Sequence, residues 1–175
     1  MITLNFAFWM MIILFAVIGA MRGWAKELLV TFAVILGLFV IAVIERFAPQ
    51  TLRQFLLTDG PQQFWIRSGI LLVLVFFGYQ TPNLPRIPQE RFVREKLSDT
   101  LLGFFIGALN GYLIVGSLLY FMAVAGWPFA PNITPPATES VIFNYLPPEV
   151  LLANNSPLIY FAVAVAFVFI LVVFI

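Results

Sequence analysis

Five long apolar runs constrain this chain more than any other feature of its sequence. A helix that crosses about 30 Å of hydrocarbon needs roughly 20 mostly apolar residues. Of the 175 residues, 62% are hydrophobic and 10% are charged, far from the balance of soluble domains. The sequence therefore predicts an all-α, polytopic integral membrane helix bundle with about five transmembrane helices. The runs cover about residues 4–21, 28–44, 64–79, 101–125 and 157–175.

The connections divide the chain into three parts. Residues 1–126 are expected to form a four-span membrane core, 127–156 a proline-rich extracytoplasmic loop, and 157–175 a C-terminal span. The first two runs are predicted to form a tight antiparallel hairpin. Short amphipathic helices are expected at the membrane surface over residues 51–57 and 89–100. No charged residue precedes Arg22, so we expect the first run to be a retained span and not a signal peptide.

The basic residues of the connections predict how the chain lies in the membrane. Lysine and arginine in short loops are retained on the cytoplasmic side. The first and third connections hold six of them, and the second connection with the start of the third run holds three. This favours an external N-terminus and a cytoplasmic C-terminus. The six are Arg22, Lys26, Arg86, Arg91, Arg94 and Lys96, and the three are Arg46, Arg53 and Arg67.

Small residues recur at four-residue spacing on three of the apolar runs. Helices in lipid associate through close backbone packing, which small residues permit. The fourth run has a tandem series of glycines, which predicts a packing groove about three turns long. We expect this span to lie centrally, packed within the chain or against a second copy, and the alternative is that its glycine face contacts another protein. The candidate packing residues are Gly19, Gly23, Ala33, Gly37, Gly103, Gly107 and Gly111.

Two polar residues lie within the predicted spans. Asn110 is expected to form an interhelical hydrogen bond, which in a membrane contributes on the order of 1 kcal/mol. Arg67 stands near the start of a short span, where its side chain can reach the interface. The alternative for both residues is that they line a polar path through the membrane.

Charged residues at two span ends have structural and functional interpretations. Arg22, Lys26 and Glu27 surround the first turn, where they are expected to anchor the topology or to contact lipid headgroups or a partner. Asp99 is predicted to cap the N-terminus of the fourth span, which would begin near Leu101.

The composition argues against several classes of function. The chain has no cysteine and no histidine, so the commonest zinc ligands and the usual general base are missing. We find no phosphate-binding loop and no convergent catalytic group, and therefore predict no enzyme, metal or cofactor. A net charge of +1 makes nucleic acid an improbable partner.

Two stretches resemble the colicin V production protein (CvpA) family. MRGWAKELLVTFAVILGLFVIA, residues 21–42, is similar to the family's first hairpin through Arg22, Gly23 and Glu27. DTLLGFFIGALNGYLIVGSLL, residues 99–119, is similar to its fourth span, with an aspartate before a glycine series. The likeness covers roughly residues 4–126. The family pattern often has a basic residue where Asn110 stands, and the fifth run extends beyond the family's four-span core.

The resemblance implies a bacterial inner-membrane protein without known catalysis, linked to bacteriocin production or export and to envelope upkeep. We therefore expect a scaffold or accessory subunit that contacts membrane lipids and forms a homo-oligomer or part of a larger membrane complex. Two alternatives stay open: a small transporter or channel component, and a scaffold that associates with quinone or pigment.

Overall fold

The computed structural model describes residues 4–47, 60–80, 93–129, 141–152 and 158–174. These ranges are almost wholly helical and contain no strand, which confirms the predicted all-α membrane bundle. Four helices are long and apolar enough to cross a membrane, and α7 is a shorter apolar helix. The bounds are α1 Leu4–Arg22, α2 Trp24–Phe47, α4 Pro61–Tyr79, α5 Val93–Val124 and α7 Leu158–Phe174.

Glycine and proline fix where the long helices begin and end. Gly23 separates α1 from α2 and has a φ of 87°, a conformation that glycine adopts without strain. Pro61 occupies the first turn of α4, where its missing N–H would be unpaired in any case. Neither α1, α2 nor α5 contains a proline, so their hydrogen-bond ladders run without interruption.

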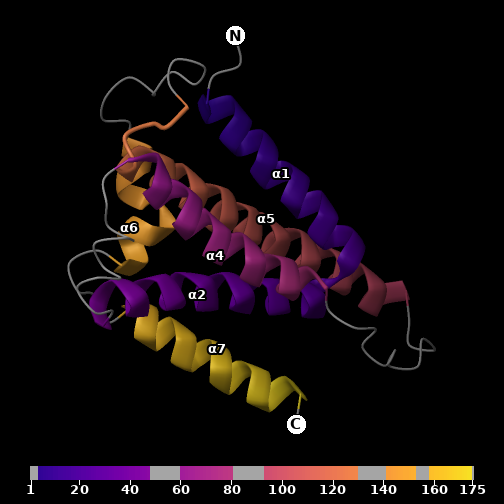
Figure 1. The fold of residues 1–175 in the computed structure, drawn as a ribbon. Helices are drawn as coiled ribbons and strands as arrows, with labels where there is room; N and C mark the ends of the chain where they lie inside the picture. The colour runs from indigo at the N-terminus through magenta and orange to yellow at the C-terminus, as the bar shows by residue number, and fades with distance from the viewer. Residues whose placement is uncertain (1–3, 48–59, 81–92, 130–140, 153–157, 175) are drawn as a thin grey trace.

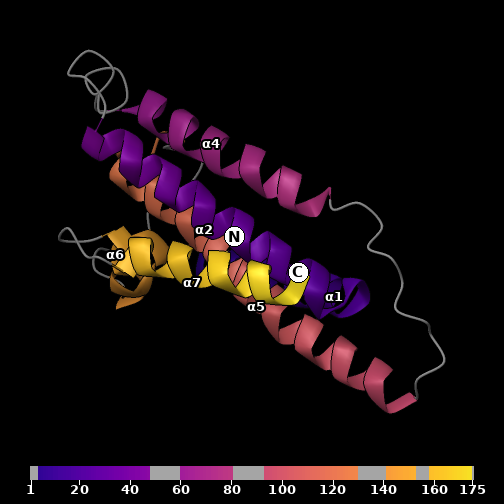
Figure 2. The same ribbon diagram turned by 90° about the horizontal axis from the view of Figure 1, so that it is seen from below.

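Helix α5 lies at the centre of the bundle. It contacts α1, α2, α4 and α6, while α2 packs between α5, α4 and α7 (Figures 1 and 2). α1 and α2 diverge from the turn at Gly23, and α1 packs along α5 (Figure 1). The tight hairpin predicted for the first two spans is therefore wrong, because α1 finds a closer partner in the glycine-bearing face of α5.

The main core forms where α2, α4 and α5 meet. It contains fully or nearly fully buried side chains such as Val34, Leu38, Leu71 and Phe121. A second cluster joins α1 to the C-terminal half of α5 through Phe8, Ile12 and Leu119. Large apolar side chains on the outer faces are exposed, as expected where lipid is the solvent. These outward residues include Phe6, Trp9, Trp65, Phe77, Phe105 and Phe161.

Helix α5 begins earlier than the sequence predicts. The segment from Val93 to Thr100 continues without a break into the membrane span, and the helix has 32 residues. Figure 2 shows its first turns projecting past the turn between α1 and α2. From Val93 onward, the prediction of a separate interfacial helix over residues 89–100 is therefore wrong. The sequence has no helix breaker around the junction of Thr100 and Leu101, so one helix continues through it. The other predicted amphipathic helix, over 51–57, and residues 89–92 lie outside the described residues.

Part of the predicted proline-rich loop is folded onto the bundle. Two short elements, η1 (Val141–Tyr145) and α6 (Pro147–Leu152), follow α5. Leu146 and Pro147 are buried, and a Cβ placed on Gly116 would lie 2.7 Å from Cδ of Pro147. The Tyr112 hydroxyl donates to a backbone carbonyl of η1. Pro147 starts a helix here instead of excluding one, because proline is favoured in a first turn.

Candidate functional site: a buried polar network

The most unusual feature inside the bundle is a buried carboxylate. Glu27, one turn into α2, has no exposed surface. The sharp turn at Gly23 brings Arg22 back over α2, and its Nη1 lies 2.7 Å from Oε1 of Glu27. Charges in a membrane interior are tolerated when they are paired in this way. The pair places one negative and one positive charge together, so it brings no net charge into the bundle.

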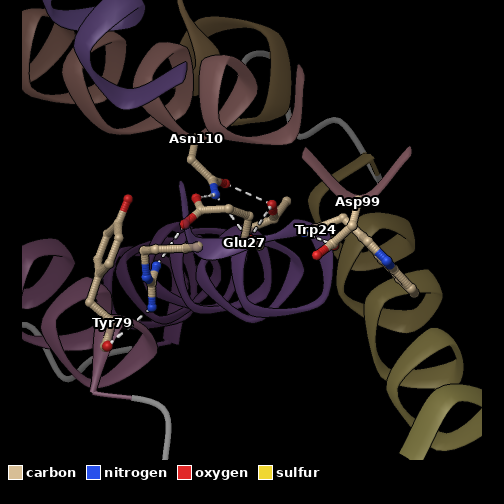
Figure 3. Close-up of polar contacts among 7 residues, drawn as sticks. Trp24, Glu27, Tyr79, Asp99 and Asn110 are labelled. Carbon is tan, nitrogen blue, oxygen red and sulfur yellow. Dashed lines mark hydrogen bonds and ion pairs between the residues drawn. The ribbon is translucent and has the colours of Figure 1, made fainter. Parts of the chain in front are cut away.

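Asn110 joins this pair from α5. Its Nδ2 donates to Oε2 of Glu27 at 2.8 Å and to the backbone O of Glu27 at 2.9 Å. Thr31, one turn further along α2, donates from Oγ1 to Oδ1 of Asn110 at 2.6 Å. Both carboxylate oxygens of Glu27 and all polar groups of the Asn110 amide thus have partners (Figure 3).

Arg22, the last residue of α1, extends the network to a fourth helix, α4. Its Nη2 donates to the backbone O of Tyr79 at 3.2 Å, at the C-terminal end of α4, where a cation is favoured. The guanidinium carbon also lies 4.4 Å from the centre of the Tyr79 ring, within the range of a cation–π contact. We name Arg22, Glu27, Thr31, Tyr79 and Asn110 the Glu27 network; it ties α2 to α5 and to α4.

Two buried hydroxyls lack a hydrogen-bond partner among the described residues. One is the Tyr79 hydroxyl, whose backbone O and ring already contact Arg22. The other is Oγ of Ser68, in the N-terminal half of α4. The network therefore fixes the ring and backbone of Tyr79 and does not use its phenol.

Asp99 caps a different helix from the predicted one. Because α5 begins at Val93, Asp99 lies inside α5 and cannot be its N-cap. Its Oδ1 instead accepts from the backbone N–H of Trp24 at 3.0 Å, at the first residue of α2. A Cβ on Gly23 would lie 2.8 Å from Oδ2 of Asp99. The carboxylate thus caps α2 from across the bundle, and glycine at position 23 leaves it room.

The candidate packing residues face two different neighbours. A Cβ on Gly107 would lie 2.5 Å from the backbone O of Phe15 and 2.9 Å from Cα of Gly19, and one on Gly111 would lie 3.1 Å from Cα of Ile12. Gly103 also lies directly against Gly19. On α2, Ala33 faces Gly78 of α4, and Gly37 faces Leu71. The glycine face of α5 is thus covered by α1 of the same chain.

Arg67 belongs to a second polar group at the opposite end of α2. Its Nε and Nη2 each lie 2.7 Å from Oε1 of Glu45, near the end of α2. Its guanidinium carbon is 5.9 Å from the Phe121 ring centre. Glu149 of α6 interacts with the nearby Tyr120 hydroxyl. The structure therefore does not bring Arg67 and Asn110 together.

The three residues at the first turn that were predicted to contact lipid or a partner, Arg22, Lys26 and Glu27, have different surroundings in the structure. Arg22 and Glu27 pair with each other, and Glu27 is buried, so its predicted contact with lipid or a partner is wrong. The carboxylate points inward because Asn110 offers it a donor at that level. Lys26 is half-buried and forms no ion pair within the described ranges.

Sequence reasoning missed Thr31, Tyr79 and Glu45. One signal was present: Thr31 stands four residues after Glu27, so both lie on one face of α2.

Among the described residues, no group of three potential acidic, cysteine or histidine ligands could hold a metal ion.

Comparison with known proteins identifies a family. The model of the family described as "Colicin V production protein" matches residues 4–149, which include all four long helices and the start of α6. No curated protein and no solved structure matches the chain.

Proposed function

This chain belongs to the colicin V production protein family, and we propose that it acts as a non-enzymatic scaffold or accessory subunit of a larger assembly in the bacterial inner membrane. Its family membership supports a link between this assembly and colicin V production or export. The proposal depends on one observation, the Glu27 network, in which the polar side chains at the centre of the bundle bind one another. They hold helices together, and within the described ranges the Tyr79 hydroxyl is the one buried polar side-chain group of the network without a hydrogen-bond partner.

The same contacts weigh against a transporter route through Asn110 and Arg67. Asn110 has no exposed surface and lies in the Glu27 network, while Arg67 is paired with Glu45 near the other end of α2. A polar path requires ionisable groups that face a shared cavity. These two residues belong to separate, internally paired groups.

The glycine series of α5 supports packing of helices within one chain and not association between two copies of the chain. Because α1 covers Gly103, Gly107 and Gly111, this face is not available to a second chain. We propose that glycine packing holds α1 against α5. The short distances between the backbones of these two helices support this proposal. Any partner must bind the outer surfaces, such as the exposed face of α4 that carries Trp65 and Phe77.

We also propose that the N-terminus is external and the C-terminus cytoplasmic. The turn between α1 and α2 carries Arg22 and Lys26 and lies at the same end of the bundle as the start of α5 (Figure 1), the part of α5 that contains Lys96. Arg46 and Arg67 lie at the opposite end. Retention of basic loops in the cytoplasm favours the first end as the inner one.

In-membrane cross-linking followed by affinity purification in mild detergent tests the scaffold proposal. The chain has no cysteine, so single cysteines introduced by Phe77→Cys on the outer face of α4 and by Ile12→Cys in the α1–α5 interface give a matched pair. We expect the outer position to capture a membrane protein, or a second copy, in fixed ratio, and the inner one to capture none. Two results together would favour a transporter. One is recovery of only the monomer from both cysteine variants, and the other is solute flux in liposomes that is abolished by Arg67→Gln.

A further inference from the structure

An apolar groove separates the N-terminal half of α2 from α7. Contacts of Ile159 and Tyr160 with the bundle, including a ring contact between Tyr160 and Phe39, hold the start of α7 against α2. Beyond this point the two helices diverge (Figure 1). Between them lies a groove of about 420 Å³. Its walls are formed mainly by Leu28, Phe32 and Ile35 of α2 and by Phe161, Val165 and Phe169 of α7.

The chemistry of the lining selects an apolar occupant. Thr31 and Trp24 bring the only polar side-chain atoms among the lining residues. The Thr31 hydroxyl donates its one proton inward to Asn110, so it has no donor left for a ligand in the groove. Trp24 is the first residue of α2, at the end of the groove where a span leaves the membrane. Tryptophan at that level typically lies beside lipid headgroups, where its indole can donate a hydrogen bond.

The dimensions fit one hydrocarbon chain. Two turns of a helix with its side chains occupy roughly 850–1,200 Å³, about two to three times the volume of the groove, so a partner helix would enter it only with part of its surface. Along α2, the distance from Trp24 to Ile35 is about 16 Å at 1.5 Å per residue. This length is close to half of the roughly 30 Å hydrocarbon core. The groove therefore extends from one membrane surface to the midplane, the depth of a single leaflet.

We propose that the groove holds one acyl chain of a glycerophospholipid as a resident ligand, with the glycerol ester region at Trp24. The lipid comes from the leaflet in which α2 begins. Its chain fills the space that α2 and α7 leave between them and so holds α7 to the bundle. Such a lipid exchanges more slowly than the lipids that surround the outer faces.

Fluorescence of Trp24 reports directly on this occupant. A variant of the full chain in which Trp9, Trp65 and Trp127 are replaced by phenylalanine keeps Trp24 as the only tryptophan. The variant is reconstituted in phosphatidylcholine vesicles whose acyl chains carry bromine, which quenches tryptophan on contact. The vesicles are then fused with a roughly tenfold excess of unbrominated phosphatidylcholine vesicles. We expect part of the quenching to persist after bulk lipid has mixed.

Two alanines of α7 supply a matched pair of variants. Ala166→Phe fills the groove, whereas Ala164→Phe adds the same ring on the exposed side of α7. We expect the persistent quenching to be lost in the first and kept in the second. Ala25→Phe, from the opposite wall of the groove, repeats the test if Ala166→Phe does not fold. Quenching that follows the bulk lipid in every variant would overturn the proposal. So would recovery of an isoprenoid in stoichiometric amount, or a dimer that groove-filling variants abolish.

Discussion

Asn110→Leu removes the hydrogen bonds that join α5 to α2 while leaving a side chain of similar shape. Three bonds are lost: two donated to Glu27, at 2.8 and 2.9 Å, and one accepted from Thr31 at 2.6 Å. Interhelical bonds in membranes average about 0.6 kcal/mol, with a maximum near 1.7. A bond to a charged group contributes about 1.5–3 kcal/mol, and here its loss leaves Oε2 of Glu27 buried without a donor. Together these values predict a loss of about 2–4 kcal/mol in the free energy of unfolding.

Ser117→Ala is the matched control for this substitution. Ser117 is as fully buried in α5 as Asn110, but its hydroxyl donates to the backbone O of Leu113 in the same helix, at 2.5 Å. This bond joins no two helices, so we expect a loss below about 1 kcal/mol. Both variants and the parent are unfolded reversibly in mixed micelles with a rising fraction of sodium dodecyl sulfate, and helix content is followed by circular dichroism.

The reasoning fails if Asn110→Leu is as stable as Ser117→Ala. A double-mutant cycle with Thr31→Val then isolates one bond of the network. We expect a coupling energy of about 0.6–1.7 kcal/mol between positions 31 and 110, and additive effects would show that this contact contributes nothing.

Three further substitutions test separate contacts by the same unfolding assay. Gly107→Leu should destabilise the chain by about 3 kcal/mol or more, because the neighbouring atoms are backbone; Gly69→Leu, where a Cβ meets nothing within 4 Å, should be neutral. Equal effects would contradict the close packing of α1 on α5. Tyr79→Phe removes a hydroxyl that has no partner in the described part of the chain and keeps the ring beneath Arg22, so stability should be unchanged or higher by about 1 kcal/mol; a clear loss would reveal a missed bond. Asp99→Ala should lower stability by about 1 kcal/mol through loss of the cap on α2, and no change would refute that role.

The sequence predicts the spans well because their signals are local. Apolar length and helix breakers placed α1, α2, α4 and α5, and the glycine spacing identified the face of α5 that α1 covers. The upstream end of α5 was missed for the same reason: the polar residues before Leu101 indicate the end of a membrane span but not of a helix.

The partners inside the site could not be predicted, because they depend on tertiary contacts. A carboxylate in the first turn of a helix normally stabilises the helix end at the membrane surface, so Glu27 was expected there. Only the position of Asn110, 83 residues away in sequence, shows why it is buried. Asp99 was likewise assigned to its own helix, whereas the N–H group that it caps belongs to α2.

Water accessibility of position 110 tests the central claim most directly. The chain has no cysteine, so Asn110→Cys and Leu97→Cys each provide a single thiol, and Leu97 is 59% exposed on the projecting turns of α5. A thiol reacts with a water-soluble maleimide as the thiolate, which forms only where water reaches. In intact membranes we predict rapid labelling at position 97 and none at position 110 until the protein is unfolded with detergent. Rapid labelling of a folded Asn110→Cys protein would show an aqueous path through the bundle and contradict the account.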